Sequence, residues 1–378
     1  MAGAAVGGCE APSKAKPRTA RPPPLLPPLE EGGSMGGRTR PKNQDKKHKS
    51  CCYLCGGLKV NSPTSFFMLS RRTIRIKVLQ LIYALGKDEQ MTFNNALSQY
   101  NTNARRTHEL YLLGLLYLIE VTRFSRKDLE NRKAKHLPTP EDKLFRPKLY
   151  ENPIIESLVG FEPLQKAVIR HKLSGRIDYD SIRMMYNEFT KVDTYMPYVL
   201  ESNTTEEGHL TQVLQLMRFL LTNELFIGVM DDFSTCWEDD ETLVYGAFKK
   251  TVKKLPNTDE IYIDFNDEDL ATRAFGESLL IKAHKNRDEI LAYISPMLHN
   301  WDADRVATVD MIILQLAVCE LMYFETIPTK VTLNEYVEIS KLYSSEKSKE
   351  FVNGVLDQLM KKLQADGKII KAGRGLMA

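Results

Sequence analysis

Apolar residues that recur at steps of three and four positions make a helical fold the expectation for most of the last third of this chain. The clearest example is residues 341–363, whose apolar side chains are Phe351, Val352, Val355, Leu356, Leu359, Met360 and Leu363. That spacing places one apolar stripe on a single helix face, which must be buried against a core. Ser344 or Ser345 can cap the start, and Gly367 stands where a left-handed C-terminal cap belongs. Gly354 lies inside this helix at a cost of about 1 kcal/mol against alanine, which predicts the close approach of another backbone.

The same helical spacing recurs earlier in the chain, and no stretch of useful length shows the alternation typical of a strand. In residues 69–87 it is formed by Ile74, Val78, Leu81, Ile82 and Leu85. Ser70 is in position to cap this helix. Residues 103–135 and 267–298 continue the helical pattern, whereas residues 137–153 contain four prolines and predict a linker. The fold class is therefore predicted to be all-α.

Two further features of the C-terminal part predict specific contacts. Glu320 lies among apolar residues of a helix, where a charge is costly unless it is paired, so we expect it to pair with a basic group or to cap a buried backbone. Thr332 and Glu335 have the spacing of a capping box. Val331 and Tyr336 can form the hydrophobic staple that accompanies such a box. These residues predict the start of a further helix.

Residues 1–67 differ in composition from the rest of the chain. They hold 9 of the 18 prolines and 9 of the 21 glycines and carry a net charge of +7, which predicts a disordered basic tail. Cys52 and Cys55 form a CxxC near His48, but no second ligand pair follows, and a zinc site is not predicted. Because order-promoting sequence begins immediately afterwards, we interpret Met68 as the natural start and the tail as an upstream extension.

The first predicted helix carries the most concentrated group of cations in the folded part. From residue 68 onward the net charge is −4, because the whole chain carries +3, so nucleic-acid binding there requires a local patch. Arg71, Arg72, Arg75 and Lys77 supply one, and Arg72 and Arg75 share a helix face. Cations at a helix N-terminus oppose the helix dipole, which suggests that they serve something outside the helix. The two alternatives are a solvated charged end and a surface that binds an anionic polymer such as RNA.

Several segments of the chain together resemble a known family. They are RRTIRIKVLQLIY near residue 71, ILQLAVCEL near residue 313, IPTKVTLNEYVEISK near residue 327 and SSEKSKEFVNGVLD near residue 344. They are similar to the NusB family of bacterial transcription antitermination factors, over about residues 69–100 and 265–363. The resemblance implies two packed helical bundles, of which the first is enlarged by a long helical insertion.

The resemblance also implies a division of the chain into four parts. Residues 1–67 would be the disordered tail, and residues 68–265 an N-terminal helical subdomain with the arginine-rich first helix and the insertion. Residues 266–366 would form the C-terminal NusB-like bundle, followed by a flexible basic tail at 367–378.

The function implied by the resemblance is RNA binding in the cytoplasm. The protein would bind the boxA element of ribosomal RNA leader transcripts together with NusE, a ribosomal protein, and would help RNA polymerase pass terminators. By motif, the RNA-binding residues would be Arg71, Arg72, Arg75, Lys77, Lys347, Ser348, Phe351 and Asn353. Single-stranded RNA recognition needs charge for phosphates and an aromatic or amide group for bases, and these positions supply both. Asp310 matches a family position on the NusE side, while Met311 and Gln315 stand where basic residues are frequent.

This interpretation is non-enzymatic and requires no cofactor, metal or membrane. No apolar run reaches the roughly 18 residues that span a bilayer. One alternative is the helical domain that precedes the catalytic domain in some RNA cytosine methyltransferases. Such an enzyme needs a glycine-rich loop to hold its cofactor and a nucleophilic cysteine near a proline. No strand–loop–helix with clustered glycines follows residue 57, and neither Cys236 nor Cys319 has the required setting. The other alternative is a protein-interaction module that uses the middle region.

Overall fold

The computed structural model describes residues 68–259, 261–298 and 307–372, with only the backbone of residues 346 and 347. The expectations for the tail of residues 1–67, for its CxxC motif and for residues 373–378 lie outside this range. The described residues all belong to one compact unit.

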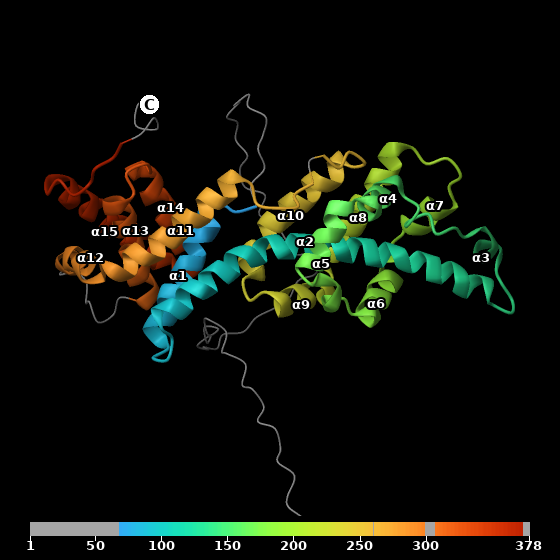
Figure 1. Cartoon of the computed structure of the whole chain (residues 1–378), viewed down its shortest axis with the longest axis horizontal. Coiled ribbons are helices and arrows are strands. Elements are labelled where there is room, and N and C mark those ends of the chain that lie inside the picture. The colour runs from blue at the N-terminus through green and yellow to red at the C-terminus, as the bar shows by residue number, and fades with distance from the viewer. Residues whose placement is uncertain (1–67, 260, 299–306, 373–378) are drawn as a thin grey trace, which may run out of the picture. The chain divides into compact units, whose positions relative to one another are not determined.

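Every regular element in the described ranges is a helix, which confirms the all-α fold class (Figure 1). The α-helices are α1 (Arg71–Lys87), α2 (Phe93–Lys133), α3 (Pro140–Leu144), α4 (Pro153–Gly160), α5 (Glu162–Arg170), α6 (Tyr179–Phe189), α7 (Tyr195–Leu200), α8 (Glu206–Thr222), α9 (Glu224–Phe233), α10 (Trp237–Lys254), α11 (Asp267–Lys285), α12 (Arg287–Ile294), α13 (Thr308–Tyr323), α14 (Thr329–Tyr343) and α15 (Glu346–Ala365). Two short 3₁₀ helices are η1 (Leu173–Arg176) and η2 (Ser295–Leu298).

Side-chain caps explain where the outer helices of the chain begin and end. The hydroxyl of Ser70 accepts from the N–H of Thr73 at the start of α1, and Ser345 caps α15 in the same way. Gly367 follows α15 with φ +65°, as predicted, and Lys368 N–H donates to the carbonyl of Leu363 at 2.9 Å. This left-handed residue and the bond across it form the expected C-terminal cap.

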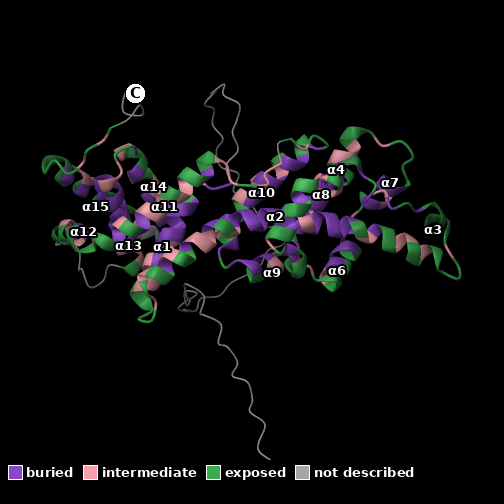
Figure 2. Cartoon of the chain, in the orientation of Figure 1, coloured by how far each residue is buried: buried purple, intermediate pink, exposed green. Residues whose placement is uncertain are grey.

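Two hydrophobic cores share the long helix α2, which at 41 residues is about 60 Å in length. The first core is built by the middle of α2 together with α4–α10. The second core is built by α1, the first turns of α2 and α11–α15. Tyr100 and Ala104 on α2 lie in the second core, and buried residues from Leu110 to Val121 lie in the first. Figure 2 shows buried positions continuing along α2 from one group of helices to the other.

The division of the chain at residue 265 stays a prediction. The position of α1 in the structure, however, differs from the subdomain to which the sequence assigned it. The arginine-rich first helix was assigned to the N-terminal subdomain. In the structure Ile74, Val78 and Leu81 of α1 are buried in the second core, with the C-terminal helices. The C-terminal bundle therefore depends on a helix from the opposite end of the folded chain.

The prediction of a linker over residues 137–153 is wrong, because this segment packs against the first core. Phe145 and Leu149 are buried there. Two of the four prolines are the first residues of α3 and α4, where the missing N–H costs nothing. The prolines therefore mark helix starts in a packed segment.

Gly276 on α11 allows three helices to approach closely. A Cβ atom at this position would overlap Cγ2 of Ile74 on α1 and the hydroxyl of Tyr100 on α2. That hydroxyl donates to the carbonyl of Arg273 at 2.7 Å. Gly354, for which the sequence predicted such an approach, is exposed, and a Cβ atom added there would meet nothing within 4 Å, so that prediction is wrong.

His108 on α2 is a buried titratable group. Its side chain is 2% exposed and its ring centroid lies 5.1 Å from that of Phe265. Burial lowers the pKa of His108 to about 4, against about 6.5 in an unfolded chain. The neutral ring is therefore favoured in the folded state, so its contribution to stability is present above pH 6.5 and is lost as the pH falls toward 4.

We expect this histidine to make the fold sensitive to mild acid. Between pH 7 and pH 5 it removes about 2 kcal/mol from the free energy of unfolding. Urea denaturation followed by circular dichroism measures this loss of unfolding free energy. The substitution His108→Phe should abolish the part of the loss that comes from His108. The matched control is His136→Gln, since His136 is exposed. Equal pH dependence in wild type and His108→Phe would contradict the expectation.

Among the described residues, no single helix is long and apolar enough to cross a membrane. Helices α8 and α9 satisfy length and composition only as a pair, and the chain bends by 67° between them. Leu216, Leu220 and Met230 of this pair are buried in the first core.

Candidate nucleic-acid interface

The exposed arginines at the start of α1 are held by contacts to two other helices. Before the helix begins, the N–H groups of Met68 and Leu69 both donate to Oδ1 of Asp269 on α11 at 2.8 Å. Arg71 is exposed, and its guanidinium lies 5.7 Å from the ring centroid of Phe275. The start of α1 is thus fixed against α11, with Arg71 facing solvent.

Arg72 is exposed but paired. Its Nε and Nη2 donate to the two carboxylate oxygens of Glu335 on α14 at 2.9 and 2.8 Å, and 45% of its side chain is accessible. These hydrogen bonds raise the pKa of Arg72 above its ordinary value. A planar two-bond contact of this kind fixes the direction of the guanidinium. Its remaining N–H groups are available to a phosphate oxygen.

Arg75 corrects the prediction of an arginine cluster facing solvent. It is 1% exposed, and its guanidinium donates through Nε and Nη2 to both oxygens of Glu320 on α13 at 2.8 Å. Burial disfavours its charge, but the hydrogen bond and charge of Glu320 outweigh this and raise the pKa of Arg75. A buried guanidinium with this partner cannot also face a phosphate. Of the two partners that the sequence predicted for Glu320, a basic group or a buried backbone, the structure shows the basic group, Arg75.

The residues predicted to form a capping box belong to the same buried network. The hydroxyl of Thr332 donates to Oε1 of Glu320 at 2.8 Å, and that of Tyr336 to Oε2 at 3.3 Å. Glu335 lies 3.5 Å from Nη1 of Arg75 while it holds Arg72. Helix α14 begins at Thr329, one turn before the predicted start, and Pro328 is its N-cap residue. The capping-box prediction is wrong because tertiary partners take both side chains.

Lys77 is also internal. Its ammonium donates to Oδ2 of Asp240 on α10 at 2.8 Å, and both side chains are 0% exposed. Thr107 on α2 donates to the same oxygen at 2.7 Å. Burial raises the pKa of Asp240, although the charge and hydrogen bond of Lys77 act against the rise. Lys77 therefore ties α1 to the α2–α10 pair, and its predicted contact with RNA does not fit this position.

The predicted residues on α15 are divided between the core and the surface. Asn353 is exposed, and Ser348 is half-buried with its hydroxyl 2.9 Å from that of Ser345. Phe351 is 7% exposed and belongs to the second core, a position that does not fit its predicted contact with a base or sugar. The backbone of Lys347 lies in the first turn of α15, and its side chain lies outside the described atoms.

Helix α14 connects the two predicted halves of the interface. It contacts α1 through Glu335, and it leads through the turn at Ser344 and Ser345 into α15. Because the two helices are joined by so short a turn, positions equally far from it lie at about the same level. Glu335 and Gly354 are such a pair, so Asn353 lies near the level of Glu335, the partner of Arg72. The first turn of α15 lies about 12 Å further along α14, beyond Tyr343.

Asp310, predicted to face NusE, is 3% exposed. Its Oδ1 accepts from the hydroxyl of Ser344 at 2.5 Å, which fixes the start of α13 to the turn before α15. The neighbouring Gln315 is also buried and donates to the carbonyl of Ala283 at 3.0 Å. Asp310 is therefore placed to hold this turn, and a direct surface contact from its side chain does not fit its burial.

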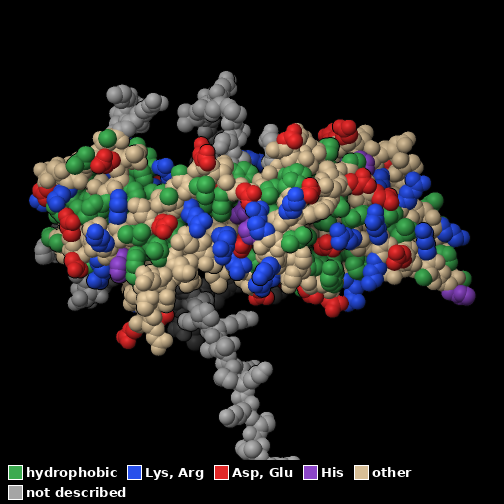
Figure 3. Space-filling model, in the orientation of Figure 1, with side chains coloured by type: hydrophobic (Ala, Val, Ile, Leu, Met, Phe, Trp, Pro, Cys, Tyr) green, Lys and Arg blue, Asp and Glu red, His purple; other side chains and the backbone are tan. Residues whose placement is uncertain are grey.

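The charge distribution around the start of α1 is not the continuous positive patch that the sequence suggested. Of the five basic residues on α1, Arg75 and Lys77 are neutralised inside the protein and Arg72 is paired at the surface. On the face drawn in Figure 3, Lys and Arg side chains alternate with Asp and Glu. Phosphate contacts here would come from individual cations held in fixed directions, with Asn353 on α15 as an exposed amide.

Within the described residues there is no group of three His, Cys, Asp or Glu side chains that could hold a metal ion. Cys236 and Cys319 are both buried, and burial raises the pKa of each thiol. Neither is therefore activated as a nucleophile. Fold and surface together define an all-helical protein with exposed arginines on α1 and an exposed amide on α15.

Comparison of the sequence with known proteins identifies similar proteins and a matching family model. The sequence model of the NusB family matches residues 242–361, from α10 to α15. "Transcription antitermination protein NusB" of Salinibacter ruber is 40% identical over 111 residues, which cover 29% of this chain and 69% of that protein. The protein of the same name from Chloroherpeton thalassium is 34% identical over 109 residues, covering 29% and 52%. That from Clostridium botulinum is 50% identical over 84 residues, covering 22% and 63%.

The chain belongs to the NusB family, a family of transcription antitermination proteins. It spans about half to two thirds of the length of these relatives. No solved structure matched it. The sequence model of the family does not extend to α1–α9, so the greater part of the first core lies outside it.

Proposed function

We propose that this protein is an RNA-binding transcription antitermination factor that binds boxA-type single-stranded RNA together with NusE. Membership of the NusB family is the observation that carries the proposal. In a cell it would work in the cytoplasm within the antitermination complex of RNA polymerase, as an adaptor with no catalytic step. The affinity for RNA would rise when NusE docks, because one continuous contact surface is then extended.

Three exposed residues are the best supported contacts for this RNA. Arg71 and Arg72 lie at the start of α1, and Asn353 lies on α15. The two guanidiniums suit phosphate oxygens, and the amide suits the edge of an exposed base. Arg75 and Lys77 hold the helix in place and are not proposed as contacts.

A titration of fluorescently labelled RNA tests the proposal. Wild-type protein is titrated into boxA-type RNA and into a scrambled RNA of the same composition, with and without NusE. We expect tighter binding to the boxA-type RNA and a further gain with NusE. The double substitution Arg71→Ala/Arg72→Ala should weaken binding about tenfold, equivalent to ~1.4 kcal/mol.

Lys361→Ala is the matched control, because Lys361 is an exposed cation of α15 paired with Asp357 on its own helix. It removes one charge from the same bundle and should leave RNA binding unchanged. Equal affinity for the boxA-type and scrambled RNA would refute the proposal. So would a double arginine variant that binds as tightly as Lys361→Ala.

A further inference from the structure

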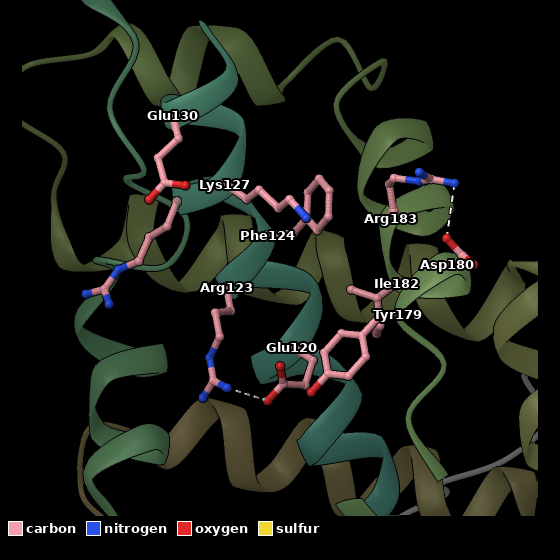
Figure 4. A pocket seen from close by; sticks show the side chains of 10 residues that line it. Glu120, Arg123, Phe124, Lys127, Glu130, Tyr179, Asp180, Ile182 and Arg183 are labelled. Atoms are coloured by element: carbon pink, nitrogen blue, oxygen red, sulfur yellow. Dashed lines mark ion pairs between the residues drawn. The ribbon is translucent and has the colours of Figure 1, made fainter. Parts of the chain in front are cut away.

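A groove of about 460 Å³ lies between α2 and α6, outside the part of the chain that matches the NusB family model (Figure 4). Residues of two helices line it, and α6 packs on α2 in the first core. The lining combines aromatic rings, a buried carboxylate and exposed cations. None of these groups is used by the function proposed above.

Aromatic rings lie on both sides of this groove. Tyr179, the first residue of α6, is 70% exposed, although the adjoining Ile182 is buried in the first core. Asp178 caps α6 by accepting from the N–H groups of Asp180 and Ser181, which fixes the turn that carries Tyr179. Phe124 on α2 is half-buried across the groove. An exposed ring on a fixed helix start offers a face on which a nucleobase can stack.

Glu120 supplies a hydrogen-bond acceptor in the lining of the groove. Its residue is 8% exposed, and its Oε1 pairs with Nη1 of Arg123 at 2.8 Å. Burial raises the pKa of Glu120, and the charge of Arg123 acts in the opposite direction. Figure 4 shows its carboxylate beside the hydroxyl end of the Tyr179 side chain. An acceptor at this place favours a ligand that carries an exocyclic amino group in the plane of an aromatic ring.

Cations stand at the rim of the groove. Arg126 and Lys127 are exposed, and in the part of the chain that the structure describes neither has a carboxylate within ion-pair distance. Each makes a cation–π contact with an aromatic ring. Arg126 lies 4.2 Å from the ring centroid of Tyr150, and Lys127 lies 5.8 Å from that of Phe124. Arg183 is already paired with Asp180 at 3.1 Å. Arg126 and Lys127 are therefore the groups available to an anion.

We propose that this groove binds one nucleotide of single-stranded RNA, with its base stacked on Tyr179, a base amino group donating to Glu120, and its phosphate against Arg126 and Lys127. Adenine, cytosine and guanine carry the exocyclic amine that this requires, and uracil does not. The groove should therefore prefer the first three bases. An acidic peptide fits less well, because its carboxylates would meet Glu120 and it offers no planar group to the tyrosine.

The proposal rests on the proposed function and adds a second RNA contact to it. Tyr100 of α2 lies beside Ile74 of α1 at Gly276, and Glu120 is 20 residues further along α2. At 1.5 Å per residue the groove lies about 30 Å along the helix from that point. An RNA bound at the start of α1 would therefore need several additional nucleotides to reach the groove. The consequence is an affinity that depends on RNA length and base type.

The test uses the full chain and four labelled RNAs. They are a boxA-type RNA alone and the same RNA extended at either end by ten adenines, ten cytosines or ten uracils. We expect extension with adenine or cytosine to tighten binding about fivefold or more, and extension with uracil to add less. Tyr179→Ala and Arg126→Ala/Lys127→Ala should abolish the gain. Tyr179→Phe keeps the ring and should retain it.

Lys166→Ala is the matched control for charge, because Lys166 is an exposed cation on α5 paired with Glu162. If the extensions add nothing, or if Tyr179→Ala keeps the full gain, the groove proposal is overturned while binding to the short RNA still supports the proposed function. Equal gains with uracil and adenine would also overturn it.

A second assay tests the groove independently of boxA recognition. Hexamers of adenylate and uridylate are titrated without any boxA element, with an oligoglutamate as competitor. Tyr179-dependent binding of the adenylate hexamer supports the groove even if the boxA-type RNA is not recognised. Tyr179-dependent binding of oligoglutamate in place of adenylate would identify an acidic peptide as the ligand and contradict the proposal.

Discussion

Replacing Arg75 by alanine should reduce the free energy of unfolding by about 3–5 kcal/mol, because it leaves Glu320 buried without its cationic partner. Glu320 is 0% exposed, and Thr332 and Tyr336 would be its remaining hydrogen-bond donors. Neither donor carries a compensating charge. A loss of this size is a large part of the 5–15 kcal/mol that is typical of a folded domain. Urea denaturation followed by circular dichroism measures it.

The neighbouring Arg72 provides the matched control. It has the same side chain one turn away on α1, and its partner is also a glutamate, but it is 45% exposed. Exposed pairs contribute roughly 0–1 kcal/mol, so Arg72→Ala should change stability by no more than that. Arg75→Lys should restore only part of the loss, since an ammonium cannot reproduce the two parallel bonds. An Arg75→Ala variant as stable as Arg72→Ala would contradict the structural role of this residue.

The second large effect is expected at Lys77. Lys77→Met keeps the apolar stem and removes the charge, so that Asp240 is left buried and unpaired. One of its oxygens, Oδ1, already lacks a hydrogen-bond partner among the described residues. We expect a loss of about 3–5 kcal/mol in the free energy of unfolding, measured by the same denaturation assay.

A double substitution distinguishes a lost ion pair from general damage to the core. Lys77→Met/Asp240→Leu removes both charges and replaces them by apolar groups of similar size. Replacing a buried pair in this way is often neutral or stabilising. The double variant should therefore be more stable than Lys77→Met alone. If it is less stable than either single variant, the loss comes from packing and not from an unpaired charge.

The helices themselves were largely predictable, because the apolar spacing and the caps act within a few residues. Ser70, Ser345 and Gly367 all have the local roles that their positions indicate. The pairing of Glu320 was also predictable in kind, since a carboxylate in an apolar helix needs a partner. The identity of that partner was not, because it lies 245 residues away in the chain.

The candidate site was predicted less well, for the same reason. Position on one helix cannot tell whether an arginine faces solvent or another helix. Arg72 and Arg75 have similar sequence surroundings, yet one is exposed and the other buried. Thr332 and Glu335 have the spacing of a capping box, but a buried carboxylate and two arginines attract them more strongly. Long-range partners override local signals wherever a charge has to be neutralised in the core.

The glycines show the same limit. Gly354 and Gly276 both lie inside helices and both weaken them locally. Gly276 is required because α1, α2 and α11 pack closely there, whereas Gly354 faces solvent. Nothing in the local sequence distinguishes them. The groove beside Tyr179 was likewise invisible, because its two walls are separated by about 60 residues of chain.

The salt dependence of RNA binding tests most directly whether the exposed arginines of α1 contact phosphates. The association constant of boxA-type RNA is measured from low to moderate salt for wild type and for Arg71→Ala/Arg72→Ala. Each phosphate contact on a single strand contributes about 0.7 to the slope of log K against log salt. The double variant should therefore show a slope smaller by about 1.4. An unchanged slope would mean that these arginines do not contact the RNA backbone.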